Sequence, residues 1–387
     1  MMTTIGKDEK LKRATKIVCK QGLVPFPLSD TAIAVIDSVV GDHEDELDLI
    51  YAFREKASQT TEQLAASSGF SEQKATSLAG SLAKKGLIFN QPNSSGLMVF
   101  RLLPFMVVGL MEYMFMGELK GTAKEKELAG LFEKMTENLR NQTQQNYDAL
   151  IPLFEKMPAV DRTVPVRNTM GGKSINIIPV GKTMTVPDEF ILPSQSVEEI
   201  IRKFDEIAVG YCFCRQRRSV LGEPCKTDAP TLNCFTFGKS ARFTVEQGFA
   251  KAITKDEALS IMKDAENAGL VHKAFHPGSR ENNPETSICN CCKDCCDTMN
   301  LWRNGTSALV NSTYHLSVID TEACTGCGTC EERCPTDAIK INDDGVATVD
   351  ESSCFGCGVC SRFCPETAIS LKEGFRRVFI LPPRLRS

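Results

Sequence analysis

The first half of the chain is nearly without cysteine, because Cys19 is the only one of the 18 cysteines within the first 211 residues. Tryptophan and histidine are also scarce, with one and four residues. The most apolar stretch, residues 102–116, is interrupted by Pro104, Gly109 and Glu112 and is shorter than the roughly 20 residues of a membrane-spanning helix. We therefore expect a buried helix there and no transmembrane segment.

Export signals are missing as well. The opening sequence MMTTIGKDEKLKRATK contains neither the apolar core of a signal peptide nor a twin-arginine pair, which predicts a cytoplasmic protein. In a reducing compartment cysteines remain thiols, and such thiols are suited to binding metal instead of forming disulfides.

Nucleotide-binding motifs are absent from the sequence. No G-x-G-x-x-G opens a strand–helix unit, so a nicotinamide or flavin would have to reside on a partner. The segments beginning at Gly172 and Gly181 end like phosphate-binding loops, but the first glycine of that motif is replaced by Arg167 and Asn176. The sequence assigns no small-molecule substrate.

What the chain does contain is a doubled C-x2-C-x2-C-x3-C-P run. The segment CTGCGTCEERCPTDAIK aligns with CFGCGVCSRFCPETAIS along its whole length, at an offset of thirty residues. Zinc sites also use four cysteines, but their spacings pair two C-x2-C units instead of placing three in series. The two runs consist of Cys324, Cys327, Cys330 and Cys334, then Cys354, Cys357, Cys360 and Cys364.

This pattern resembles the bacterial two-cluster ferredoxin domain. The resemblance implies two [4Fe–4S] clusters, with the fourth cysteine of each run ligating the other run's cluster. One cluster would then take Cys324, Cys327, Cys330 and Cys364, and the other would take Cys354, Cys357, Cys360 and Cys334.

A second group of nine cysteines lies within residues 212–296, a density that predicts one or two further iron–sulfur clusters, with zinc as the weaker alternative. The sequence leaves their partition open. Arg215 beside the first pair can balance a cluster's negative charge or bind an anionic partner. His272 is a candidate cofactor-binding residue or a histidine satisfied by backbone at a helix end. The nine are Cys212, Cys214, Cys225, Cys234, Cys289, Cys291, Cys292, Cys295 and Cys296.

The N-terminal part predicts a winged helix over residues 46–103. Helices are expected at 46–56, 61–67 and 71–85, followed by two strands within 87–103. The third helix has lysines but no arginine, and Glu72 lies near its N-terminal end, so nucleic-acid binding is not favoured.

The 387 residues, 42% of them hydrophobic, predict an α+β protein of several domains. The order of a C-x-C-R segment, a GLVH segment and CNCC-x2-CC before the ferredoxin runs resembles uncharacterised multi-cluster iron–sulfur proteins, roughly over residues 60–372. The expected parts are a lead-in (1–45), the winged helix (46–103), a helical segment (104–160), a cysteine-rich metal-binding domain (161–318), the ferredoxin domain (319–372) and a basic, apolar tail (373–387).

These features predict an electron-transfer protein, either a subunit or a partner of a larger anaerobic oxidoreductase. Residues 321–372 carry nine acidic and four basic side chains, which favours a basic redox partner. Two other hypotheses remain open: a reductase whose active site is the central cysteine-rich cluster, and a redox-sensing DNA-binding regulator. The sequence does not decide whether the chain is an enzyme by itself, nor its oligomeric state.

Overall fold

The computed structural model describes residues 5–22, 26–179, 196–276 and 284–385. The chain divides into two compact units. The first unit comprises Met1–Thr136, Gln216–Pro224 and Arg242–Lys251, and the second comprises Glu137–Arg215, Cys225–Ala241 and Ala252–Ser387. The phosphate-loop-like segment at Gly181 lies outside the described residues.

The first unit contains the helices and strands expected for residues 46–103, together with a short strand that the sequence did not predict. Thr60 caps α4 in a capping box with Gln63, and the Ser71 hydroxyl accepts a hydrogen bond from the Lys74 N–H at the start of α5. The winged-helix assignment itself stays a prediction. The elements are α3 (Glu44–Tyr51), the 3-10 helix η1 (Ala52–Arg54), β1 (Ser58–Thr60), α4 (Thr61–Ser68), α5 (Glu72–Lys84), β2 (Ile88–Pro92) and β3 (Met98–Leu102), with strand order β1-β3-β2.

The residues before and after this region differ from expectation. The lead-in forms two helices, α1 (Lys7–Cys19) and α2 (Asp30–Val40). The helix expected over residues 102–116 begins only at Leu110, as α6 (Leu110–Met116). The preceding loop is held by the Glu112 carboxylate, which accepts hydrogen bonds from the N–H groups of Val107 and Gly109. None of the described helices is long and apolar enough to cross a membrane.

The second unit is built on a nine-stranded sheet with strand order β5-β14-β11-β4-β9-β10-β7-β6-β8. Most of its strands are short, and their pairing is mostly antiparallel, with parallel pairing of β4 with β11 and of β5 with β14. The strands are β4 (Asp161–Val164), β5 (Ile177–Ile178), β6 (Ile207–Tyr211), β7 (Leu232–Phe237), β8 (Lys251–Ala252), β9 (Val271–Phe275), β10 (Ser287–Cys291), β11 (Leu309–Ile319) and β14 (Ile369–Ile380).

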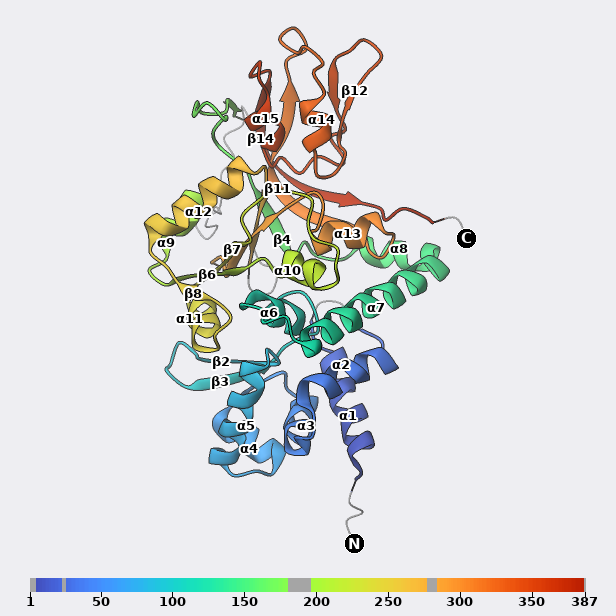
Figure 1. Cartoon of the computed structure of the whole chain (residues 1–387), viewed down its shortest axis with the longest axis vertical. Coiled ribbons are helices and arrows are strands. Elements are labelled where there is room, and N and C mark those ends of the chain that lie inside the picture. Colours follow the sequence, from blue (N-terminus) through green and yellow to red (C-terminus); the bar gives the residue numbers. More distant parts are fainter. Residues whose placement is uncertain (1–4, 23–25, 180–195, 277–283, 386–387) are drawn as a thin grey trace. The chain divides into compact units, whose positions relative to one another are not determined.

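Helices lie around this sheet, and two of them cover one of its faces. Figure 1 shows α9 and α12 alongside the strands. Of these helices, those wholly within the second unit are α8 (Tyr147–Glu155), α9 (Val197–Lys203), α12 (Lys255–Asn267) and α13 (Asp297–Arg303). Three further helices are divided between the two units, namely α7 (Ala123–Gln145), α10 (Phe213–Val220) and α11 (Lys239–Glu246).

The sheet has two chemically different faces, because side chains alternate along a strand. On one face, Val209, Phe235, Ala274 and Ile288 pack in a single apolar core with residues of α9 and α12. The residues between them point to the other face. From the strand registers, that face carries Cys234, Cys289 and Cys291 together with Asp161 and Lys273.

The residues predicted as the ferredoxin domain connect two long strands of this same sheet. β11 and β14 pair from Leu309↔Ile380 to Ile319↔Ile369, and they extend toward the segment that carries α14 and α15 (Figure 1). The predicted boundary at 318/319 therefore falls inside β11. The connecting elements are α14 (Thr329–Arg333), β12 (Ile339–Ile341), β13 (Ala347–Val349) and α15 (Val359–Phe363).

The C-terminal tail packs on its own unit. Trp302 Nε1 donates to the Leu381 carbonyl at 2.9 Å, and the Tyr147 hydroxyl donates to the Pro382 carbonyl at 2.5 Å. The guanidinium of Arg377 donates to the carbonyls of Glu155 and Met157. The described part of the tail thus packs on the second unit of the chain itself.

The capping box of α12 gives a stability prediction. The Thr254 side chain accepts from the Glu257 N–H, and the Glu257 carboxylate accepts from the Thr254 N–H. We expect Thr254→Ala to lower the free energy of unfolding by about 1 kcal/mol, because the helix loses its N-cap acceptor. Anaerobic thermal unfolding should show a lower Tm for this variant, whereas Thr254→Ser should match the parent. Equal Tm values for all three proteins would contradict the prediction.

Candidate metal centres

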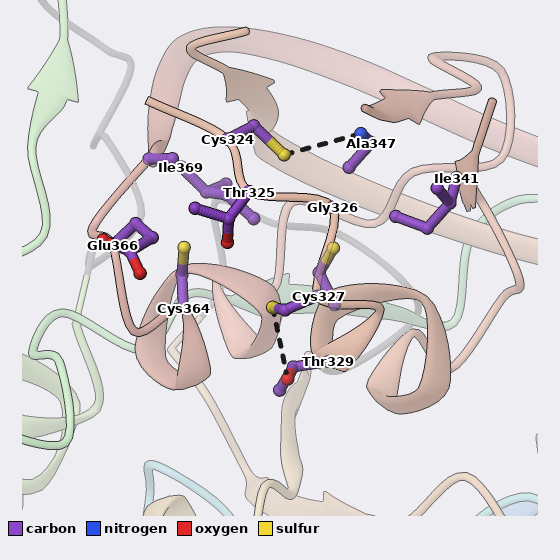
Figure 2. Close-up of a pocket in the computed structure, with 12 residues that line it drawn as sticks. Cys324, Thr325, Gly326, Cys327, Thr329, Ile341, Ala347, Cys364, Glu366 and Ile369 are labelled. Atoms are coloured by element: carbon purple, nitrogen blue, oxygen red, sulfur yellow. Dashed lines mark hydrogen bonds between the residues drawn. The ribbon is translucent and has the colours of Figure 1, made fainter. Parts of the chain in front are cut away.

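Four cysteines from the two runs line one surface pocket, which we call the outer site. The outer site consists of Cys324, Cys327, Cys330 and Cys364. Figure 2 shows Cys324 and Cys327 on one loop and Cys364 on another segment of the chain, around the same space. Cys327 is exposed, and Cys324 and Cys364 are half-buried. The fold therefore brings the last cysteine of the second run to the first three cysteines of the first run.

The other four cysteines of the runs form the inner site, Cys334, Cys354, Cys357 and Cys360, and all four are buried. Burial raises the pKa of Cys357, and the charges of Cys360, Cys334 and Cys354 raise it further. Burial likewise raises the pKa of Cys360 to about 12. Thiols that are this hard to ionise become thiolates readily only when a cation compensates the charge, as a bound metal does.

Glycine is required where each cysteine loop approaches another backbone segment. At Gly356, φ is +61°, and a Cβ would lie 2.0 Å from the His315 carbonyl oxygen. At the equivalent residue of the first run, Gly326, φ is +65° and a Cβ would lie 1.9 Å from the Gly345 carbonyl oxygen. A methyl group cannot occupy either position without moving the backbone.

The central cysteines divide into groups. In the first, the sulfurs of Cys225, Cys292 and Cys295 all lie within 4.8 Å of one another. Cys225 Sγ is 3.5 Å and Cys295 Sγ is 3.0 Å from Cys292 Sγ. The hydrogen bond from Cys295 lowers the pKa of Cys292 to about 5. Although burial opposes it, the charges of Cys212, Cys292 and Cys295 raise the pKa of Arg215, which places this guanidinium beside them. We call Cys212, Cys225, Cys292 and Cys295 the Arg215 group.

A second set of thiols includes Cys214, which also interacts with Cys212 of the Arg215 group. Hydrogen bonds from Cys214 and Cys291 lower the pKa of Cys296 well below its ordinary value. The Asp297 N–H donates to Cys214 Sγ at 3.3 Å. We call Cys214, Cys291 and Cys296 the Lys273 group, since the charge of Lys273 also acts on Cys291 and Cys296. Adjacent cysteines thus belong to different groups.

The remaining pair, Cys234 and Cys289, lies across two neighbouring strands. Cys234 belongs to β7 and Cys289 to β10, and the hydrogen bond between them raises the pKa of Cys289. The charge of Cys296 acts in the same direction. The charge of Cys212 acts on Cys289 as well, so the pair lies near both groups and can supply a fourth thiolate to the Lys273 group.

His272, a candidate from the sequence, belongs to β9 and not to a helix end. Its Nδ1 lies 2.6 Å from Asn290 Oδ1, and its Nε2 lies 3.5 Å from Glu266 Oε1. It points to the face of the sheet opposite Lys273 and Cys289, because it alternates with Lys273 along the strand. The structure does not bring His272 together with the thiols.

Lys273 and Asp161 are residues that the sequence interpretation missed. Lys273 Nζ lies 2.9 Å from Asp161 Oδ1, and each side chain is only 1% exposed. Although burial lowers it, the charges of Asp161 and Cys291 raise the pKa of Lys273 above its ordinary value. A signal was present in the sequence: a charged residue in the middle of the apolar segment GLVHKAF is unusual in a buried strand.

One apolar cluster joins the central thiols to the inner site. Cys296, Phe355, Cys357 and Val271 pack together in it, and Cys291 packs against it. Phe355 lies between two cysteines of the inner site, Cys354 and Cys357, and is 1% exposed. The Lys273 group and the inner site are therefore in direct packing contact through Phe355.

Comparisons with known proteins match the C-terminal part of the chain. Residues 317–371 match the family model of the 4Fe-4S dicluster domain. A curated "Probable ferredoxin" of Methanosarcina thermophila is 53% identical over 30 residues, which cover 8% of this chain and 52% of that protein. The alignment thus spans about half the length of the ferredoxin. No solved structure matches the chain. The wider resemblance predicted for residues 60–372 stays a prediction outside the matched segment.

The close approach at Gly356 gives a second prediction. We expect Gly356→Ala to displace the inner-site loop and to reduce the iron content by about four atoms per chain, one [4Fe–4S] cluster. Gly328→Ala is the matched control, since Gly328 also has positive φ, +79°, but a Cβ there would meet nothing within 4 Å. Iron analysis of anaerobically purified protein checks this. Equal iron content in both variants would show that the contact with His315 is unimportant.

Proposed function

We propose that the chain is an iron–sulfur electron-transfer protein that relays single electrons between the outer site, the inner site and the central thiols. The observation that carries the proposal is the packing of the inner-site loop against the Lys273 group through Phe355 and Cys296. The 4Fe-4S dicluster match over residues 317–371 supports it.

The donor sets fit the proposed cofactors. The outer and inner sites each gather four thiols, three from one run and the fourth from the other, as two-cluster ferredoxin domains do. A [4Fe–4S] cluster bound by such thiolates exchanges one electron at a time. In the central region, the Arg215 group supplies four thiols and the Lys273 group supplies three, with Cys234 or Cys289 as the fourth. We propose one further cluster on the Arg215 group and a second on the Lys273 group.

The exposure of the cysteines indicates which site a partner protein can approach. Cys327 of the outer site is exposed, whereas the inner-site and Lys273-group thiols are buried or half-buried. A partner protein can therefore approach the outer site most closely. Exposed acidic side chains surround it: Glu366 lines the pocket, and Asp343 and Asp344 lie beside Gly345, which contacts the outer loop. We propose that a basic one-electron carrier docks there and exchanges one electron with this chain.

The N-terminal unit offers little charge for binding DNA. Lys74 Nζ of α5 lies 2.8 Å from Asp45, and the Nζ of Lys85, the C-cap residue of α5, lies 2.6 Å from Glu46. Two of the lysines of the third predicted helix, residues 71–85, thus form ion pairs with carboxylates of the same unit. Because phosphate contacts need free positive charge, we favour a scaffold role over DNA binding.

A reductase with its active site at the central thiols is the second candidate function. The Arg215 group favours it, because a buried guanidinium beside four thiols can bind an anionic substrate as well as compensate the charge of a cluster. A substrate that perturbs the electron paramagnetic resonance (EPR) signal of the central cluster would favour this reductase over a pure relay.

The central clusters can be tested by iron analysis. We expect the anaerobically purified chain to contain about 12 to 16 irons, since each [4Fe–4S] cluster contributes four. Cys292→Ser should remove about four irons, because Cys292 is the central thiolate of the Arg215 group. Cys19→Ser is the control and should remove no iron. Cys19 belongs to α1 in the first unit, and its thiol donates a hydrogen bond to the Pro27 carbonyl oxygen. About eight irons in the unsubstituted protein would limit the relay to the outer and inner sites.

The docking surface can be tested with a basic c-type cytochrome as the electron acceptor. We expect Glu366→Lys to reduce the rate of electron transfer from the dithionite-reduced chain by about tenfold at low ionic strength, because steering toward the outer site is lost. The difference should shrink at high salt. Glu198→Lys on α9 adds the same charge away from the pocket and should leave the rate nearly unchanged. Equal rates for the two variants would exclude docking at the outer site.

A further inference from the structure

Lys273 lies at the junction of the central thiols and the inner site. Its Cα pairs with that of Cys289 across β9 and β10, so its side chain points to the thiol-bearing face of the sheet. Its Nζ lies 5.0 Å from the centroid of the Phe355 ring. The same side chain thus contacts the inner-site loop from one side and faces the Lys273 group from the other.

This junction is specific to one half of the ferredoxin repeat. The two runs align so that Phe355 of the second corresponds to Thr325 of the first. Thr325 is exposed and lines the outer pocket. Phe355 is buried against an ammonium group instead. The second run therefore has an aromatic ring, in place of threonine, in the loop that packs against the central thiols.

Lys273 retains its charge in this buried position. A buried ammonium group is stable only with a close anionic partner, and Asp161 supplies one at 2.9 Å. The charges of Cys291 and Cys296 add to this compensation. Both residues lie on the thiol-bearing face, but Asp161 acts on Cys296, whereas Lys273 acts on Cys291 and Cys296 and also lies over the Phe355 ring.

We propose that Lys273, held by Asp161, is a positioning residue that raises the reduction potential of the cluster bound by the Lys273 group. The inference rests on the proposed function, since it requires a central cluster there. An added electron makes a cluster more negative, and a fixed cation beside its thiolates stabilises that state in a medium of low dielectric. Lys273 thereby favours electron flow from the inner site to the central thiols.

The test is an EPR-monitored redox titration of the full, anaerobically purified chain. We expect the Lys273→Met/Asp161→Asn double variant, which leaves no unpaired buried charge, to lower the ratio of reduced to oxidised central cluster about tenfold at a fixed potential. That change corresponds to about 59 mV for one electron. Asp161→Asn alone should shift the potential in the same direction as the double variant, because a buried ammonium group without its anionic partner loses its proton. Lys273→Arg keeps the charge and should resemble the parent.

Iron analysis of the same samples separates the possible failures. Full iron content with unchanged potentials in every variant would overturn the role of Lys273 and leave the relay intact. Loss of central iron in all variants, Lys273→Arg included, would show a purely structural residue and would also overturn the inference. About eight irons in the parent chain would instead remove the central cluster on which the inference depends.

Discussion

Mutual repulsion among buried thiolates is the constraint on which the second unit depends. Seventeen cysteines lie within residues 212–364, and most of them are buried or half-buried. Like charges so close together raise each other's pKa, as at Cys357 and Cys289. Such groups are stable as anions only with nearby positive charge. The unit supplies it through Arg215 and Lys273, and the bound iron of the proposed clusters would supply the rest.

The sheet separates this charged chemistry from the apolar core. Alternation along β7, β9 and β10 directs Phe235, Ala274 and Ile288 to the core under α9 and α12, and it directs thiols and Lys273 to the opposite face. A shift of one residue in any of these strands would bury charge in the core and expose apolar side chains. The hydrophobic packing of one face therefore fixes the positions of the ligands on the other.

Continuity of β11 and β14 connects the ferredoxin segment to the same sheet. Because these strands pair from Leu309 to Ile319, the inner-site loop is attached to the sheet that carries the central thiols. The distance between the inner site and the central thiols is therefore fixed by the sheet, which suits electron transfer between bound clusters. The outer site, with exposed Cys327, is left for exchange with a partner, while the inner site and its glycines are enclosed.

The sequence alone determined the features that depend on local spacing: the two cysteine runs and most of the helices and strands of residues 46–103. It also indicated the crossed grouping of Cys334 and Cys364, through the resemblance of the runs to a known domain. Only the tertiary structure decided how the central cysteines divide, that His272 lies on the far face of β9, and that Lys273 and Phe355 meet. The physical reason is that these arrangements depend on strand register and long-range packing between segments up to about 80 residues apart, which residue spacing does not encode.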